Sequence, residues 1–200
     1  FGDILDIKTH PNRWDTMSLV GLAREIAANA TKPVKLVEPK LQQVSYSDKG
    51  KVKLTSTAEC SHFVSAKLSV DNSGKSPQWL VDNLESNGLR SINPVVDISN
   101  YVMLEYGQPS HSYDAAKLNG QLCVRRAKKA ESLPCLDGKT RQLTEDDIVI
   151  ADSVSVVGIA GVMGGATTET KPNTSEIVLE VAVFDKTLVR KTAQRHGIRT

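Results

Sequence analysis

The residues best suited to chemistry in this sequence include a carboxylate set inside an apolar run. Glu180 lies within EIVLEVAVF at 176–184, where alternation along a strand places it on one face with Val178 and Ala182. One interpretation is an edge strand whose second face meets solvent, because an isolated Glu is seldom buried. The other is an acceptor aimed into a pocket. There the carboxylate could select a ligand hydroxyl, since a buried acceptor left unmatched is costly.

An amide and an imidazole flank a second apolar run, NYVMLEYGQPSH at 100–111. His111 follows a Gly-Gln-Pro helix stop, and loop residues in such places often reach into clefts. A structural or solvated histidine is the alternative. Asn100 lies among apolar residues of a helical pattern, so its amide needs a hydrogen-bond partner. Capping a neighbouring loop would satisfy that need as well as a ligand would.

Glycines and basic residues form two further groups. GIAGVMGG at 158–165 has neither of the glycine spacings that mark nucleotide-binding loops. A tight turn between strands is the favoured interpretation, and close approach of backbone N–H groups to a ligand is the alternative. Basic residues in the last helical pattern indicate either a solvated face or a patch that faces phosphate. These are Lys186, Arg190, Lys191, Arg195 and Arg199.

The composition excludes several classes of protein. Three cysteines without a CxxC pair suggest neither a disulfide framework nor a zinc site, and they favour a reducing cytoplasm. No apolar run approaches the roughly 20 residues that cross a bilayer, and no signal-peptide pattern opens the chain, so we expect no membrane partner. No HExxH motif or nucleophile elbow appears, and no metal site is predicted. A net charge of +2 neither demands nor excludes nucleic acid.

Helix signals position the first half of the chain. Apolar repeats predict a helix over about 18–29, capped by Ser18 or Thr16. The stretch at 76–88 predicts a second helix, with Ser76 as N-cap and a glycine at its end.

The same punctuation marks two later helices. Asn93 and the proline after it begin a helix over about 94–106, and Gly107 ends it. Because this helix is apolar nearly all round, we expect it to be central. Asp185 begins the last helix, which ends at a glycine at position 197.

Strand-like runs fill the remainder. The region 31–74 holds three, VKLVE, KVKLT and HFVSAKLSV, of which the second is expected at a sheet edge. After His111 come QLCVRRA, DIVIAD, VSVVGIAGVM and EIVLEVAVF. Helices and strands do not alternate regularly, so we expect an α+β fold with mixed sheets and several packed helices.

Taken together, the motifs resemble the β subunit of bacterial phenylalanyl-tRNA synthetase, in its central B3/B4 region. The matching words occur in the family's order and cover most of the chain. They are NRWDTMSLVGLAREIA, SPQWLVDNLESNGLRSINPVVDISNYVMLEYGQPSHSYD, LDGKTRQLTEDDIVIAD, AGVMGG, LEVAVFD and RHGIRT.

The resemblance implies an editing domain that hydrolyses the ester of tyrosine wrongly attached to tRNA-Phe. It implies an α subunit as partner, in an α2β2 assembly. The synthetic site would lie mainly in that subunit, so ATP and magnesium are expected only for the full enzyme and no cofactor for this chain. The expected boundaries are a linking segment with the first helix at 1–30, the editing domain at 31–185, and a C-terminal helix at 186–200.

The resemblance also assigns roles to single residues. Glu180 corresponds to the acceptor for the tyrosine hydroxyl, and Ala160 and Gly161 correspond to the substrate-binding glycine-rich segment. His111 and Asn100 correspond to polar residues near the ester and the terminal adenosine.

The sequence departs from the family pattern at a few positions. Ser110 stands where an apolar residue is usual, Ser112 and Tyr113 replace a common Ala-Phe, and Trp14 replaces a small residue or proline.

The expected mechanism is attack on the ester by a positioned water, with His111 as general base or as an orienting group. The alternative is a non-catalytic RNA-docking or scaffold module of the same fold.

Overall fold

The computed structural model describes residues 3–10, 12–33, 35, 53–54 and 58–199. The chain forms two compact units, each built from two separate stretches. A helical unit comprises Phe1–Ser47 and Gly74–Ser110, and a β-rich unit comprises Asp48–Ser73 and His111–Thr200. The predicted α+β class is confirmed, and no helix of the described residues is long and apolar enough to span a membrane.

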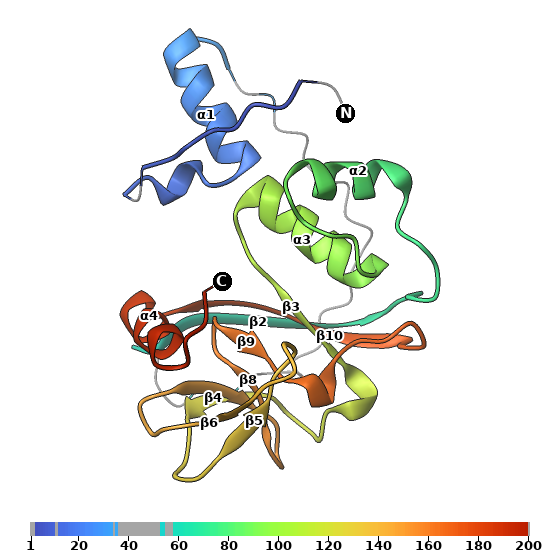
Figure 1. The fold of residues 1–200 in the computed structure, drawn as a ribbon, viewed down its shortest axis with the longest axis vertical. Coiled ribbons are helices and arrows are strands. Elements are labelled where there is room, and N and C mark those ends of the chain that lie inside the picture. Colours follow the sequence, from blue (N-terminus) through green and yellow to red (C-terminus); the bar gives the residue numbers. More distant parts are fainter. Residues whose placement is uncertain (1–2, 11, 34, 36–52, 55–57, 200) are drawn as a thin grey trace. The chain divides into compact units, whose positions relative to one another are not determined.

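The helical unit contains three α-helices and a short 3-10 turn among its described residues. α3 contacts both α1 and α2, and Figure 1 shows α2 and α3 lying side by side. The elements are the 3-10 helix η1 (Trp14–Thr16), α1 (Leu19–Ala30), α2 (Gln78–Ser86) and α3 (Pro94–Tyr106).

Local capping explains where these helices begin and end. Ser18 accepts a hydrogen bond from the Gly21 N–H at the start of α1, and Asn93 accepts one from the Val96 N–H at the start of α3. Gly107 ends α3 in the left-handed conformation, with φ of 80°. The helices predicted over 18–29 and 94–106 are therefore confirmed, with Ser18 as the cap of the first.

The predicted N-cap of α2 is wrong. Pro77 occupies the cap position, and no side chain caps the helix. The Ser76 hydroxyl instead donates to Asp97 Oδ2, which also accepts from the Ser91 hydroxyl. Asp97 Oδ1 accepts from the Ile92 N–H, at 2.8 Å. This fully buried carboxylate thus ties the segments before α2 and α3 to α3 itself.

The prediction that α3 is a central helix is also wrong. Only Val95 and Asp97 of this helix are buried, whereas Ile98, Val102 and Tyr106 are exposed. A helix with apolar residues on all sides is buried only when other elements cover every face. In the described residues α1 and α2 contact α3, and they leave part of its apolar surface exposed.

The described residues of the β-rich unit form three sheets. A five-stranded sheet has the order β1-β4-β7-β8-β9, a three-stranded sheet has the order β2-β10-β3, and β5 pairs with β6. Only β1 and β4 run parallel among these pairs. The strands are β1 (Lys53–Leu54), β2 (Cys60–Ser69), β3 (His111–Asp114), β4 (Cys123–Arg126), β5 (Ser132–Pro134), β6 (Thr140–Gln142), β7 (Ile148–Ala151), β8 (Val156–Ile159), β9 (Met163–Gly164) and β10 (Glu176–Phe184).

The predicted strands agree with this arrangement where the structure describes them. β1 lies at a sheet edge, as KVKLT was expected to, and HFVSAKLSV forms most of β2. The run VKLVE and the turn at 47–50 lie outside the described residues, apart from position 35.

Two apolar cores lie on opposite faces of the five-stranded sheet. Ile148 and Ile150 of β7 enter one core with Tyr113 and Cys60, and Val178, Ala182 and Phe184 of β10 pack against it. Val149 enters the other core with Leu133 and Leu143. Successive side chains of β7 point to opposite faces of its sheet. The β2-β10-β3 sheet therefore packs on one face and the β5–β6 hairpin packs on the other.

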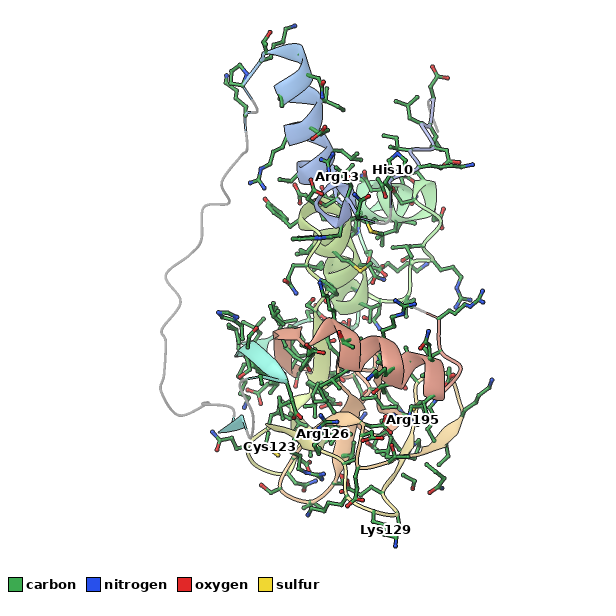
Figure 2. The ribbon with its side chains drawn as sticks, turned by 90° about the vertical axis from the view of Figure 1, so that its left-hand side faces the viewer. His10, Arg13, Cys123, Arg126, Lys129 and Arg195 are labelled. Atoms are coloured by element: carbon green, nitrogen blue, oxygen red, sulfur yellow. The ribbon has the colours of Figure 1, made fainter. Side chains whose placement is uncertain are left out.

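The last helix, α4 (Lys186–Arg195), is fixed at both ends. Asp185 accepts from the Leu188 N–H, as predicted, and the chain leaves the helix at His196 and Gly197. Figure 2 labels Arg195 in the last turn of this helix. Arg195 pairs with the buried carboxylate of Asp147, and His196 Nε2 lies 3.0 Å from the other oxygen of Asp147. Lys186, Arg190, Lys191 and Arg199 are exposed. The described part of the unit also contains two short 3-10 turns, η3 (Ala115–Lys117) and η4 (Ala166–Thr168).

Candidate functional site

The candidate site is centred on Glu180 in β10, the middle strand of the three-stranded sheet. Glu180 pairs with Ser65 of β2 on one side and with His111 of β3 on the other. The edge-strand interpretation is therefore wrong. Only 6% of Glu180 is exposed, because its face of β10 packs against the core that contains Tyr113 and Cys60.

Glu180 accepts a hydrogen bond from within the fold. The phenol of Tyr113, itself fully buried, donates to Glu180 Oε2. Burial raises the pKa of Glu180 to about 7, and the bond from Tyr113 opposes that rise. Burial, and then the charge of Glu180, raise the pKa of Tyr113 well above its ordinary value. At neutral pH the carboxylate is thus close to its titration midpoint while the phenol keeps its proton.

The second carboxylate oxygen of Glu180 has no partner in the part of the chain that the structure describes. The one hydrogen bond of Glu180 there reaches Oε2. Thr168 Oγ1 is the one wholly buried side-chain oxygen or nitrogen without a partner among the described residues, so Oε1 is not sealed from solvent. Oε1 can therefore accept a hydrogen bond from an incoming hydroxyl.

His111 lies beside Glu180 with an uncharged ring. Its imidazole meets the ring of Tyr113 edge to face, with 4.6 Å between centroids and 84° between planes. Burial lowers the pKa of His111 to about 4, so the ring is neutral at pH 7. A Cβ added at Gly164 would lie 2.5 Å from His111 Cε1 and 2.8 Å from Nε2. A glycine at 164 therefore lets the backbone of β9 approach the imidazole.

The glycine-rich segment forms the tight turn between β8 and β9 that the sequence favoured. Gly161 has φ of 66°, and a Cβ there would lie 3.1 Å from Val189 and 3.2 Å from Phe184. The Ala160 N–H donates to the Ile148 carbonyl at 3.0 Å and is committed to the fold. Gly161 N–H makes no hydrogen bond to any described residue, so of the two amides it is the one available to a ligand.

A model of the B3/4 domain family matches residues 59–200, most of the chain. The chain belongs to the B3/4 domain family. It is 42% identical over 200 residues to the phenylalanine–tRNA ligase beta subunit of Geobacter metallireducens, covering 98% of this chain and 25% of that protein. It is 38% identical over 198 residues to the beta subunit of Carboxydothermus hydrogenoformans, with the same coverage of both chains.

These comparisons confirm the resemblance inferred from the sequence. The B3/4 chain spans about a quarter of the length of its curated relatives, 25% in the first of them. Among solved structures, an N-terminal fragment of the Pyrococcus horikoshii phenylalanyl-tRNA synthetase beta subunit matches with a TM-score of 0.52. At 16% identity, over 92% of this chain and 58% of that one, this match supports the fold alone.

Four of the five predicted site residues lie in one unit of the B3/4 fold. Glu180, His111, Ala160 and Gly161 all belong to the β-rich unit. Asn100 lies in α3 of the helical unit, half-buried, and its place near a substrate ester stays a prediction.

Sequence reasoning missed two contacts of this B3/4 site, namely the phenol of Tyr113 on Glu180 and the approach of Gly164 to His111. Tyr113 follows His111 by two positions, so strand alternation would have placed both on the face of Glu180 had a strand at 111–114 been predicted. Among the described residues, no group of three or more His, Cys, Asp and Glu is arranged to hold a metal ion.

Proposed function

We propose that this chain is the editing module of a phenylalanine–tRNA ligase β subunit and hydrolyses the ester of tyrosine mischarged onto tRNA-Phe. One observation carries the proposal. Glu180 is a buried carboxylate in the middle strand of a sheet, with one oxygen held and the other without a partner among the described residues.

Such an acceptor supplies the discrimination that editing needs. Tyrosine and phenylalanine differ by one hydroxyl, and an apolar pocket rejects the larger of two such side chains weakly. A site with a buried acceptor favours the hydroxyl-bearing ester, because the phenylalanyl ester would leave the acceptor desolvated and unmatched. In this role Glu180 Oε1 accepts from the substrate phenol, and the Gly161 N–H contacts the substrate nearby.

The reaction is addition of water to the ester carbonyl. The bond from the carbonyl carbon to the ribose oxygen breaks, the amino acid leaves as a carboxylate, and the ribose hydroxyl regains a proton. With a pKa of about 4, His111 is a weak proton acceptor at neutral pH, which favours the orienting role over general-base catalysis. Its neutral ring can accept a hydrogen bond from the attacking water at one nitrogen. Asn100 is proposed to contact the ester or the terminal adenosine.

The proposed setting is a larger cytoplasmic enzyme. The partners are tRNA-Phe and an α subunit in an α2β2 assembly that joins phenylalanine to tRNA. ATP and magnesium would serve the synthetic site of that enzyme, outside this chain.

One observation favours a second function, a non-catalytic RNA-docking module. Four basic side chains of the last segment are exposed, as a phosphate-facing patch would require. They are Lys186, Arg190, Lys191 and Arg199. A docking module would bind tRNA without releasing an amino acid.

Deacylation assays separate the two functions. The assembled synthetase with full-length β subunit is given tRNA-Phe charged with tyrosine or with phenylalanine. We expect faster release of tyrosine, whereas equal rates would contradict the selectivity and no release would favour docking.

A histidine variant tests the orienting role within the same assay. His111→Ala should slow release about 10- to 100-fold, because a misplaced water attacks poorly, while tyrosine stays preferred. His62→Ala, at an exposed position on β2, is the matched control and should leave the rate unchanged. A His111→Ala enzyme with the wild-type rate would exclude His111 from the mechanism.

A further inference from the structure

Glu180 receives its one hydrogen bond among the described residues from Tyr113, which the chemistry of editing does not by itself require. Tyr113 pairs with Val178 in the β3–β10 register, so its side chain points to the same face as Glu180. The two side chains are diagonal neighbours across the paired strands. The bond therefore joins two strands that are already paired by their backbones.

The phenol of Tyr113 is held on several sides. Its ring packs against His111, and the core around it is otherwise apolar apart from the Cys60 thiol. The hydroxyl lies next to Gly158 of β8, where an added Cβ would be 3.6 Å from it. Because a fully buried phenol must find an acceptor, the Tyr113 hydroxyl keeps its bond to Glu180 Oε2.

We propose that Tyr113 is a positioning residue for Glu180, whose hydroxyl holds Oε2 and leaves Oε1 as the single oxygen that can select a substrate hydroxyl. This inference rests on the proposed editing function. Tyr113 acts through Glu180 and does not itself contact the ester. It restricts the rotation of the carboxylate, so that only a hydroxyl arriving at Oε1 is matched.

The same bond keeps Glu180 an acceptor. A donor to a carboxylate stabilises its ionised form, and burial favours the protonated form. The titratable groups that face Glu180 from the core are His111 and Tyr113 from β3 and the Cys60 thiol from β2, and no cation pairs with it among the described residues. By register, Lys67 of β2 and Glu176 of β10 share its face, but both are exposed and pair with each other at 3.0 Å. From β7, β8 and α4 the facing core residues are apolar. Tyr113 is thus the one described group that opposes protonation of Glu180 by a hydrogen bond.

The test is the pH dependence of the preference for tyrosine in the assembled synthetase. Release from tyrosyl- and phenylalanyl-tRNA-Phe is measured from pH 6 to pH 9 for the wild type, Tyr113→Phe and the control Tyr106→Phe, which removes an exposed hydroxyl in the helical unit. In the wild type the preference should rise through a midpoint near pH 7, the pKa of Glu180.

Tyr113→Phe should move that midpoint upward by about one pH unit or more, since a hydrogen bond to a charged group is lost. The preference for tyrosine at pH 7 should then fall several-fold and recover at pH 9. Tyr106→Phe should follow the wild type. A structural role alone would lower activity at every pH and leave the midpoint in place.

Other outcomes overturn the inference. An unchanged midpoint in Tyr113→Phe, or a stronger preference at pH 7, would mean that the phenol does not prepare Glu180 or that it competes with the substrate. Absence of preference in the wild type would remove the proposed function first. If Tyr113→Phe melts at a much lower temperature, fluorotyrosine at position 113 alone keeps the ring and strengthens the donor. It should move the midpoint downward, and no shift would equally overturn the inference.

Discussion

Burial shifts the pKa of Glu180 and the pKa of His111 in opposite directions. The carboxyl group moves from 4.5 to about 7, and the imidazole moves from 6.5 to about 4. Between these values both side chains are uncharged in the folded chain, although both would be charged in the unfolded chain near pH 5 to 6. The contribution of Glu180 and His111 to the free energy of unfolding therefore depends on pH.

Glu180→Gln should reveal that cost. The raised pKa of Glu180 contributes stability that is fully present below pH 4.5 and lost as the pH rises to about 7. The unfolding free energy of the Gln variant, relative to the wild type, should therefore increase between pH 5 and pH 8, by about 2–3 kcal/mol.

Denaturant titration at both pH values measures this difference. Glu176→Gln changes an exposed glutamate of the same strand and serves as the control. Curves for Glu180→Gln and the wild type that keep a constant separation at pH 5 and pH 8 would show that Glu180 is not desolvated as described.

Alternation and helix-stop signals in the sequence identified Glu180 and His111 as candidates, but not how they are joined. Both were found from residue type and local pattern. Tyr113 was noted only as a departure from the family pattern, because its role depends on the pairing of β3 with β10. The hydrogen bond between Tyr113 and Glu180 joins residues that are 67 positions apart in the sequence. The burial of Glu180 likewise depends on β10 being the middle strand.

At the scale of elements, Asp147 anchors α4 to the β-rich unit. This fully buried carboxylate accepts from the Thr144 N–H at 2.9 Å and also binds Arg195 and His196. Burial alone would raise the pKa of Asp147, but the hydrogen bonds with the Thr144 N–H and with His196, together with the neighbouring charges, outweigh burial and lower it. Val189 of α4 packs against the core beside it.

Asp147→Ala should release the end of α4 before the sheets unfold. Losing a buried charge that holds two cationic or polar partners should cost about 2 kcal/mol or more. Amide hydrogen exchange should then become faster in α4 than in β10. Asp146→Ala is the control, because Asp146 is 80% exposed and meets Arg195 only at 3.5 Å. Equal protection of α4 in Asp147→Ala and the wild type would contradict the anchoring role.

Helices were more predictable than strand pairing for a physical reason. α3 begins after Asn93 and ends at Gly107 as expected, because caps and stop residues act within one turn of the helix. β3 was not predicted, since its four residues gain their partners from β10 far along the chain. Ser76 was misassigned because the buried Asp97 competes for its hydroxyl.

At the scale of the whole molecule, each unit is assembled from two separated stretches of chain. The β-rich unit uses Asp48–Ser73 and His111–Thr200, with the helical stretch Gly74–Ser110 between them in sequence. Composition and turn signals are contiguous properties of a sequence, so they cannot reveal such an interrupted unit. The expected boundaries at 30 and 185 stay a prediction.

The most direct test of the account is the preference of Glu180→Ala in the assembled synthetase. Release of tyrosine and of phenylalanine from the same tRNA-Phe is compared at pH 8, where Glu180 is ionised, after thermal melting has shown that the variant folds. Glu176→Ala is assayed beside it. The account predicts that Glu180→Ala loses about 10- to 100-fold of the preference for tyrosine, the value of a hydroxyl bonded to a charged acceptor. A Glu180→Ala enzyme that still prefers tyrosine as strongly as the Glu176→Ala control would contradict it.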